Sequence, residues 1–135
     1  MGQFYSFDYI SYMIYNEKYK VKFYRDSRTG RSRVYDYIES LDEKCNSKIY
    51  KYINYLVENG GYLDEPYSRH IQGKIRELRV DFSNNHYRIF YFTFIGKTII
   101  LLHAFLKKTD KTPIKEMNMA LSNYNKIINN PELYE

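Results

Sequence analysis

Residues 74–113 decide the fold, with the sequence KIRELRVDFSNNHYRIFYFTFIGKTIILLHAFLKKTDKTP. Its apolar runs predict β-strands at 74–82, 86–94 and 98–105, because branched and aromatic side chains favour extended backbone. Residues 83–85 and 95–97 separate these strands, and Asn and Gly tolerate the left-handed backbone of tight hairpins. Such short loops predict antiparallel neighbours. The second and third runs are apolar at nearly every position, so we expect them at the centre of the sheet, covered on both faces.

Helical patterns surround this predicted sheet in the sequence. YKVKFY (19–24) alternates apolar and basic residues, which predicts a further strand. Residues 34–41 and 43–59 carry apolar positions at helical spacing, and Asp42 or Ser40 suits the N-cap of the second helix. Together they predict a helical hairpin over one face of the sheet.

The segments on either side of the sheet are predicted as a loop and a final helix. Residues 63–73 are expected to form a loop, since Pro66 blocks helix continuation. Pro113 suits the first turn of the last helix with Thr112 as its cap, and Met117, Leu121, Tyr124 and Ile128 form its apolar stripe. We therefore expect an α+β fold, with a small, mostly antiparallel sheet, an N-terminal helical hairpin on one face and a C-terminal helix. Residues 1–135 are expected to form a single domain.

Composition excludes several classes of protein. No apolar run approaches the length of a membrane-spanning helix, no signal-peptide pattern is present, and the single cysteine, Cys45, allows no internal disulfide. A cytoplasmic protein is the expectation. No nucleotide-binding or nucleophile-elbow motif occurs, and the three histidines and Cys45 lack metal-ligand spacing, so we expect no metal and no cofactor.

Positive charge is concentrated on the predicted sheet. The chain carries +5 overall, while residues 69–115 contain ten bases and three acids, a net +7. A one-sided basic surface is typical of a protein that binds a polyanion, and a solvated charged face is the alternative. Arg79, Arg88 and His103 lie inside predicted strands, where cations are costly unless they face a partner.

Residues 1–19 carry a separate aromatic pattern. Five tyrosines recur every three or four residues, at positions Tyr5, Tyr9, Tyr12, Tyr15 and Tyr19. Two interpretations remain open: an extra element packed on the core, or a docking surface for a partner or a second copy.

Several motifs together resemble one family of bacterial proteins. They are VYDYIESLD (34–42), the turn IQG (71–73), ELR (77–79), YRIFYF (87–92) and LLHAFLKKTDKTP (101–113). In this order they resemble the RelE/ParE toxin superfamily, and within it the HigB-like, phage Gp49-like group. The resemblance covers about residues 20–125 and leaves 1–19 as an extension.

This resemblance implies a RelE-like fold and the toxin of a type II toxin–antitoxin pair. Such toxins cut mRNA without a metal, often on the ribosome, and are silenced by a helix-turn-helix antitoxin. The resemblance gives Arg79 and Arg88 the role of phosphate ligands and matches Lys107 and Lys108 to a basic pair that assists cleavage. His103 is a candidate acid or base, and Lys74, Arg76, Arg69 and Lys111 are candidate RNA contacts.

Strand alternation supports one shared site. Arg79 lies on the opposite side of its strand from Leu78 and Val80, which should meet the helices, so Arg79 should point to the open side of the sheet. The general base is not identified: Glu77, Lys74 and His103 are all open, and His70 and His86 rank lower because they lie in a loop and at a strand end. A pair of structural arginines satisfied by Glu77 or Asp81 is the alternative to a phosphate site. Two other functions also stay open: a ParE-like toxin that inhibits DNA gyrase without cleavage, and a degenerate phage-derived protein that only binds RNA or its antitoxin.

Overall fold

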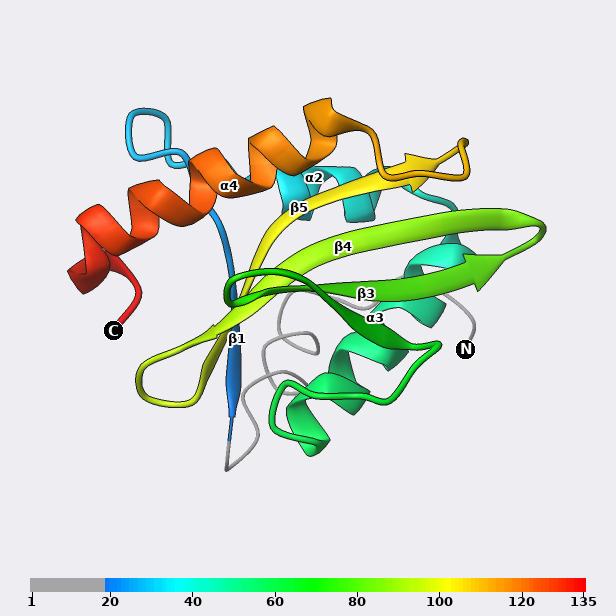
Figure 1. Cartoon of the computed structure of the whole chain (residues 1–135), viewed down its shortest axis with the longest axis horizontal. Helices are drawn as coiled ribbons and strands as arrows, with labels where there is room; N and C mark the ends of the chain where they lie inside the picture. Colours follow the sequence, from blue (N-terminus) through cyan, green and yellow to red (C-terminus); the bar gives the residue numbers. More distant parts are fainter. Residues whose placement is uncertain (1–18) are drawn as a thin grey trace.

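A computed structural model describes residues 19–135, which form a five-stranded sheet with helices on both faces (Figure 1). The elements are β1 (Lys20–Phe23), α2 (Arg33–Ser40), α3 (Glu43–Glu58), β2 (Ser68–Gln72), β3 (Ile75–Phe82), β4 (Asn85–Phe94), β5 (Thr98–Lys107), α4 (Ile114–Asn129) and the 3-10 helix η1 (Pro131–Leu133). The predicted α+β class is confirmed. No helix within residues 19–135 is long and apolar enough to span a membrane.

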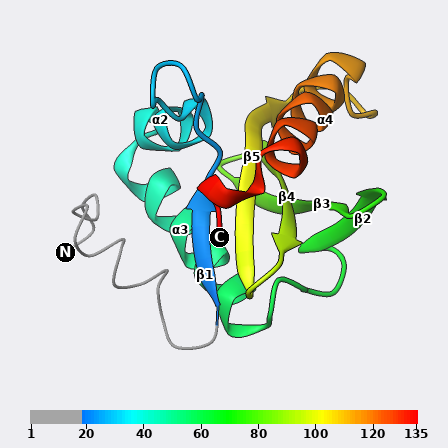
Figure 2. The same cartoon turned by 90° about the vertical axis from the view of Figure 1, so that its left-hand side faces the viewer.

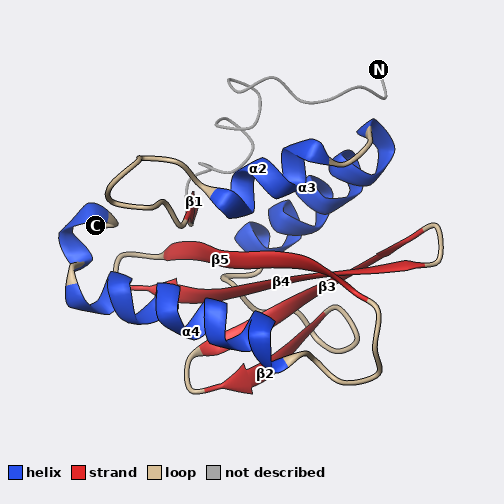
Figure 3. Ribbon diagram, turned by 90° about the horizontal axis from the view of Figure 1, so that it is seen from above, coloured by secondary structure: helices blue, strands red, loops and turns tan. Residues whose placement is uncertain are grey.

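The strand order is β1-β5-β4-β3-β2. β1 runs parallel to β5, and the other neighbours are antiparallel. β4 and β5 are therefore interior, as their continuous apolar sequences predict. Seen along the sheet, α2 and α3 lie on one side and α4 on the other (Figures 2 and 3).

Two buried clusters hold these layers together. Beneath α2 and α3, the core includes Ile38, Ile53, Leu78, Ile89 and Leu101, all at most 1% exposed. Beneath α4, it includes Phe90, Phe92, Ile100, Ala120 and Ile127. Cys45 belongs to the first cluster and is 1% exposed.

Helix α3 begins as its sequence predicts. Asp42 accepts a hydrogen bond from the Cys45 backbone N–H at 2.9 Å and so caps the helix. Helix α4 differs: its N-cap is Pro113 without a side-chain hydrogen bond, so the expected Thr112 cap is wrong. The apolar stripe of α4 is also rotated slightly. Ile127 is buried, whereas the predicted Ile128 is 44% exposed.

The segment 63–73 contains a strand that its sequence does not predict. β2 pairs with β3, so the interpretation of this whole segment as a loop is wrong. The cause is tertiary: Ser68 is buried, its Oγ lies 2.7 Å from the Tyr91 hydroxyl, and it accepts a hydrogen bond from Arg76 Nε at 3.0 Å. Partners on other strands thus fix a polar segment that lacks its own hydrophobic pattern.

The N-terminal aromatic pattern is only partly within the described residues. Tyr19 packs against the core beneath α2 and α3. Tyr5, Tyr9, Tyr12 and Tyr15 lie outside the residues that the structure describes.

Candidate active site

The hairpin between β3 and β4 positions the central residues of the site. Ser83 and Asn84 both adopt left-handed backbone, with φ of 53° and 66°, and form a two-residue turn. This turn pairs Phe82 with Asn85. The register that follows sets Asp81 opposite His86, and Arg79 opposite Arg88.

The next hairpin extends these rows to β5. Lys107 pairs with His86, and Phe105 pairs with Arg88. At the other side of β3, Arg69 on β2 pairs with Glu77. Directly opposed residues share a face of the sheet, and this face is the one turned away from α3, because Leu78 and Val80 fill the opposite side. We call the following side chains the charged face: Arg69, Glu77, Arg79, Asp81, His86, Arg88 and Lys107.

Arg88 belongs to the charged face and is only 4% exposed. Its Nη1 donates to Asp81 Oδ1 at 3.1 Å and to the Tyr87 carbonyl oxygen at 2.9 Å. Its buried Nε has no hydrogen-bond partner within residues 19–135. The guanidinium is therefore fixed at one end and keeps donor capacity at the other.

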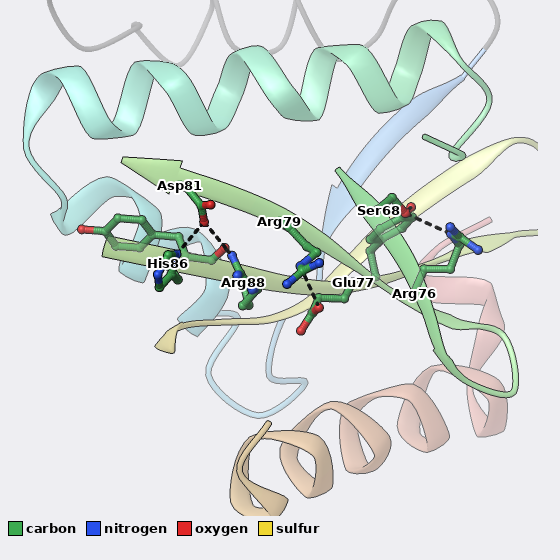
Figure 4. Close-up of polar contacts among 9 residues, drawn as sticks. Ser68, Arg76, Glu77, Arg79, Asp81, His86 and Arg88 are labelled. Atoms are coloured by element: carbon green, nitrogen blue, oxygen red, sulfur yellow. Dashed lines mark hydrogen bonds and ion pairs between the residues drawn. The ribbon is translucent and has the colours of Figure 1, made fainter. Parts of the chain in front are cut away.

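Arg79 is held more loosely beside Arg88 (Figure 4). Its Nε lies 3.6 Å from Glu77 Oε1, which is an ion pair beyond ordinary hydrogen-bond distance. The Glu77 side chain is 2% exposed and that of Arg79 is 23% exposed. Among the described residues, neither Arg79 Nε nor Glu77 Oε2 has a hydrogen-bond partner. The buried Glu77 carboxylate thus balances the charge of Arg79, and part of the Arg79 side chain remains accessible to solvent.

Asp81 contacts two side chains, His86 and Arg88, at the other end of the arginine pair. Its Oδ1 lies 2.9 Å from His86 Nδ1 and 3.1 Å from Arg88 Nη1. Burial disfavours the charged carboxylate, but hydrogen bonds from His86 and Arg88 hold the pKa of Asp81 below its usual value. Figure 4 shows Asp81 and His86 at one end of the two arginines and Glu77 at the other.

His103 is on the same side of the sheet but beneath α4. Its Nε2 lies 2.6 Å from Glu116 Oε1 in the first turn of α4, and its ring stacks on Phe105 with centroids 5.8 Å apart. The side chain is 18% exposed. The geometry therefore makes His103 a link between β5 and α4.

The other candidate residues fall into two groups. Arg76 lies on the opposite face, where its guanidinium stacks over the Tyr62 ring at 4.6 Å and its Nε bonds Ser68. Lys74, Lys108 and Lys111 are exposed in turns or loops beside the strand ends. Within residues 19–135 no group of His, Cys, Asp and Glu side chains is arranged to hold a metal ion.

The sequence interpretation did not single out the contact between Asp81 and His86. The signal that would reveal it is the turn length. A three-residue loop at 83–85 gives a different pairing, whereas the two-residue turn puts Asp81 and His86 face to face.

The chain matches the model of a recognised family. The family model for phage-derived protein Gp49-like (DUF891) matches residues 36–125, so the chain belongs to that family. The matched segment runs from α2 into α4 and contains the whole charged face.

Two curated relatives carry a functional name. The protein called probable endoribonuclease HigB1 in Mycobacterium tuberculosis is 33% identical over 101 residues, in strain CDC 1551 / Oshkosh and in strain ATCC 25618 / H37Rv. In each case the similarity covers 74% of this chain and 78% of the relative.

Proposed function

We propose that this protein is the toxin of a type II toxin–antitoxin pair and acts as a metal-free endoribonuclease on mRNA. One observation carries the proposal: Arg79 and Arg88 are directly opposed on one face, with Lys107 in the adjacent row. Membership of the Gp49-like family and similarity to proteins named HigB1 endoribonuclease support it. Two guanidinium groups side by side match the oxygens of a phosphodiester, which they bind bidentately while staying charged.

The reaction consists of one displacement at phosphorus. The ribose 2′-oxygen loses its proton and attacks the adjacent phosphorus, the bond to the 5′-oxygen breaks, and that oxygen takes a proton. The products are a 2′,3′-cyclic phosphate and a 5′-hydroxyl. Arg79 and Arg88 stabilise the negative charge that develops on the phosphoryl oxygens, and Lys107 protonates the leaving oxygen. Each cation contributes on the order of 3 kcal/mol to lowering the barrier, by analogy with a single oxyanion donor.

The pairing of both arginines with carboxylates also fits a purely structural role. The orphaned Nε atoms of Arg79 and Arg88 favour the phosphate site, because a buried donor without a partner is costly in a protein built only for stability. The exposed part of Arg79 provides access from solvent. The carboxylates then pre-orient the guanidinium groups before RNA binds.

The proposed RNA partner follows from the distribution of charge, and the proposed antitoxin follows from the resemblance to the HigB-like group. Arg69 on the charged face and Lys74, Lys108 and Lys111 beside it are suited to contact flanking phosphates of the mRNA, free or on the ribosome. A helix-turn-helix antitoxin neutralises the protein by bringing acidic side chains onto the charged face or by drawing α4 away. Arg76 is set apart from this surface because its guanidinium stacks on the Tyr62 ring on the opposite face of the sheet.

The test is cleavage of a labelled mRNA, both free and bound to ribosomes, in the presence of a chelator. We expect fragments that end in a 2′,3′-cyclic phosphate and a 5′-hydroxyl. Arg79→Ala and Arg88→Ala should remove cleavage, and Lys51→Ala, at an exposed position on α3, should not. A folded protein that leaves RNA intact under both conditions, or that instead inhibits DNA gyrase, contradicts the proposal.

A further inference from the structure

His86 has the geometry of a base that is already oriented. Its side chain is 54% exposed, and its Nδ1 lies 2.9 Å from Asp81 Oδ1. A charged carboxylate only accepts hydrogen bonds, so the proton of the neutral imidazole is on Nδ1. The lone pair of Nε2 is then free, and Nε2 makes no hydrogen bond to any residue between 19 and 135.

The same carboxylate oxygen links this imidazole to the proposed phosphate site. Asp81 Oδ1 also accepts from Arg88 Nη1 at 3.1 Å. His86 and Arg88 are two residues apart on β4 and so share a face, with about 7 Å between their Cα atoms. A ribose next to a phosphate bound by Arg88 is therefore within reach of the His86 ring.

The other candidate bases are less suitable. His103 is engaged by Glu116 at 2.6 Å beneath α4. Glu77 is 1% exposed below Arg79, so a ribose hydroxyl cannot reach it. Lys74 lies in the turn before β3, outside the rows of the charged face.

We infer that His86 is the general base of the proposed cleavage reaction and that Asp81 is its positioning residue; this inference rests on the proposed function. His86 Nε2 takes the proton of the 2′-hydroxyl as the bond from the 2′-oxygen to phosphorus forms. The bond from phosphorus to the 5′-oxygen breaks, and Lys107 gives that oxygen its proton. His86 later releases its proton to water, and Lys107 recovers one.

If His86 is the base, cleavage should depend on pH, and charged groups on neighbouring strands surround its imidazole. Three charged side chains are neighbours of His86: Asp81 on β3, Arg88 on β4, which is the strand of His86 itself, and Lys107 on β5. Arg79 lies in the next row of cross-strand pairs. From α3, Lys48 donates to the main-chain oxygen of Asp81. The cleavage rate should therefore rise with pH on the acidic side, as expected for a reaction that needs a general base.

The test compares His86→Gln and Asp81→Asn with His70→Gln. His70 is a matched control, because it is also exposed and bonds a backbone oxygen at 2.8 Å, but its cross-strand partner is Arg76 on the opposite face. Single-turnover cleavage is measured from pH 5 to 9 with the labelled mRNA, free or ribosome-bound, whichever the unaltered protein cuts. RNA affinity is measured in parallel.

His86→Gln should slow cleavage by roughly 100-fold or more, with RNA affinity unchanged. It should also remove the acidic limb of the pH–rate profile, which is the part where the rate rises with pH. Asp81→Asn should slow the saturated rate less than His86→Gln does, because the imidazole loses the carboxylate that orients it. His70→Gln should match the unaltered protein. His86→Asn provides a second variant if His86→Gln melts early.

The failures of the two proposals are distinguishable. If the unaltered protein cuts no RNA, both the proposed endoribonuclease activity and the role of His86 as its general base are contradicted. If the unaltered protein cuts RNA and both His86 variants keep its rate and its acidic limb, only the inference about His86 is overturned. A loss confined to RNA affinity, with the saturated rate unchanged, also overturns it.

Discussion

Arg79 and Arg88 stand opposite each other across β3 and β4, and each is paired with a different carboxylate of β3. Arg79 lies over the buried Glu77, whereas Arg88 is buried itself and bonds the exposed Asp81. The two cations thus have opposite surroundings. Their replacement should affect activity alike and stability differently.

Replacing Arg79 should separate these two effects. Arg79→Ala should abolish growth arrest and also destabilise the fold by about 1–3 kcal/mol, because Glu77 becomes a buried carboxylate without a counter-charge. The double variant Arg79→Ala with Glu77→Gln should regain much of that stability and none of the activity. Urea unfolding and growth curves at equal expression measure both quantities. A double variant that arrests growth would remove Arg79 from the site.

Binding of RNA should weaken steeply with salt, because Lys and Arg displace condensed counterions. Lys107→Ala and Lys108→Ala should each reduce the slope of log affinity against log salt by about one. The matched control is Lys51→Ala on α3, which should leave the slope unchanged. Fluorescence titrations at several salt concentrations provide the measurement, and a salt-independent affinity would rule out the charged face as the contact surface.

The lowered pKa of Asp81 predicts a small loss of stability in acid. Because the folded state binds this proton less tightly than the unfolded state, the contribution is present above the ordinary pKa of about 3.9 and is lost as pH falls through the folded value. Asp81→Asn should therefore lower stability at pH 7 and have little effect in acid, once the carboxyl is protonated in both the folded and the unfolded state. The side chain is 63% exposed, so the difference should be below about 1 kcal/mol and shrink in high salt. Chemical unfolding at both pH values measures it; an equal difference at pH 7 and in acid would contradict the linkage.

On the alkaline side, Tyr37 should contribute a pH dependence of the opposite sign. Burial, with smaller effects of nearby Tyr87 and Cys45, raises the pKa of Tyr37 to about 12. The contribution of Tyr37 to the free energy of unfolding is fully present below the ordinary tyrosine pKa of about 10. It is lost as pH rises from about 10 toward 12. Tyr37→Phe should therefore make the free energy of unfolding depend less on pH in this range. If thermal melts of the variant fall as steeply with pH as those of the parent, other groups cause the loss.

The bond between His103 and Glu116 should hold α4 on the sheet. His103→Gln and Glu116→Gln should increase amide hydrogen exchange in α4 to the same extent, since either change removes the same 2.6 Å contact. Cleavage should change equally in the two variants. A loss of cleavage specific to His103→Gln would restore the alternative that His103 acts on RNA.

Local sequence patterns predict most of the sheet and the helices that cover it. The continuous apolar sequences of β4 and β5 indicated interior strands, and Asp42 before α3 indicated a cap. These features depend on residues that are close in sequence, so their physics is local. Leu78 and Val80 likewise identified the face of β3 that meets the helices.

The parts that were missed depend on distant contacts. β2 has a polar sequence, and its place follows from Ser68 meeting Tyr91, 23 residues away. Arg76 was grouped with the RNA contacts because it is basic, but Tyr62 and Ser68 hold it on the other face. The contact between Asp81 and His86 depends on a turn one residue shorter than expected, which no pattern within β4 reveals.

The parallel pairing of β1 with β5 has a consequence during translation. Val21 is aligned with Ile99, so the first strand has no partner until the ribosome has made nearly 80 further residues. Domains acquire their contacts from the N-terminus onward as the chain emerges, yet this sheet cannot be closed in that order. An unpaired strand edge is therefore exposed for most of synthesis. The nascent chain is open to capture by chaperones before the finished protein exists.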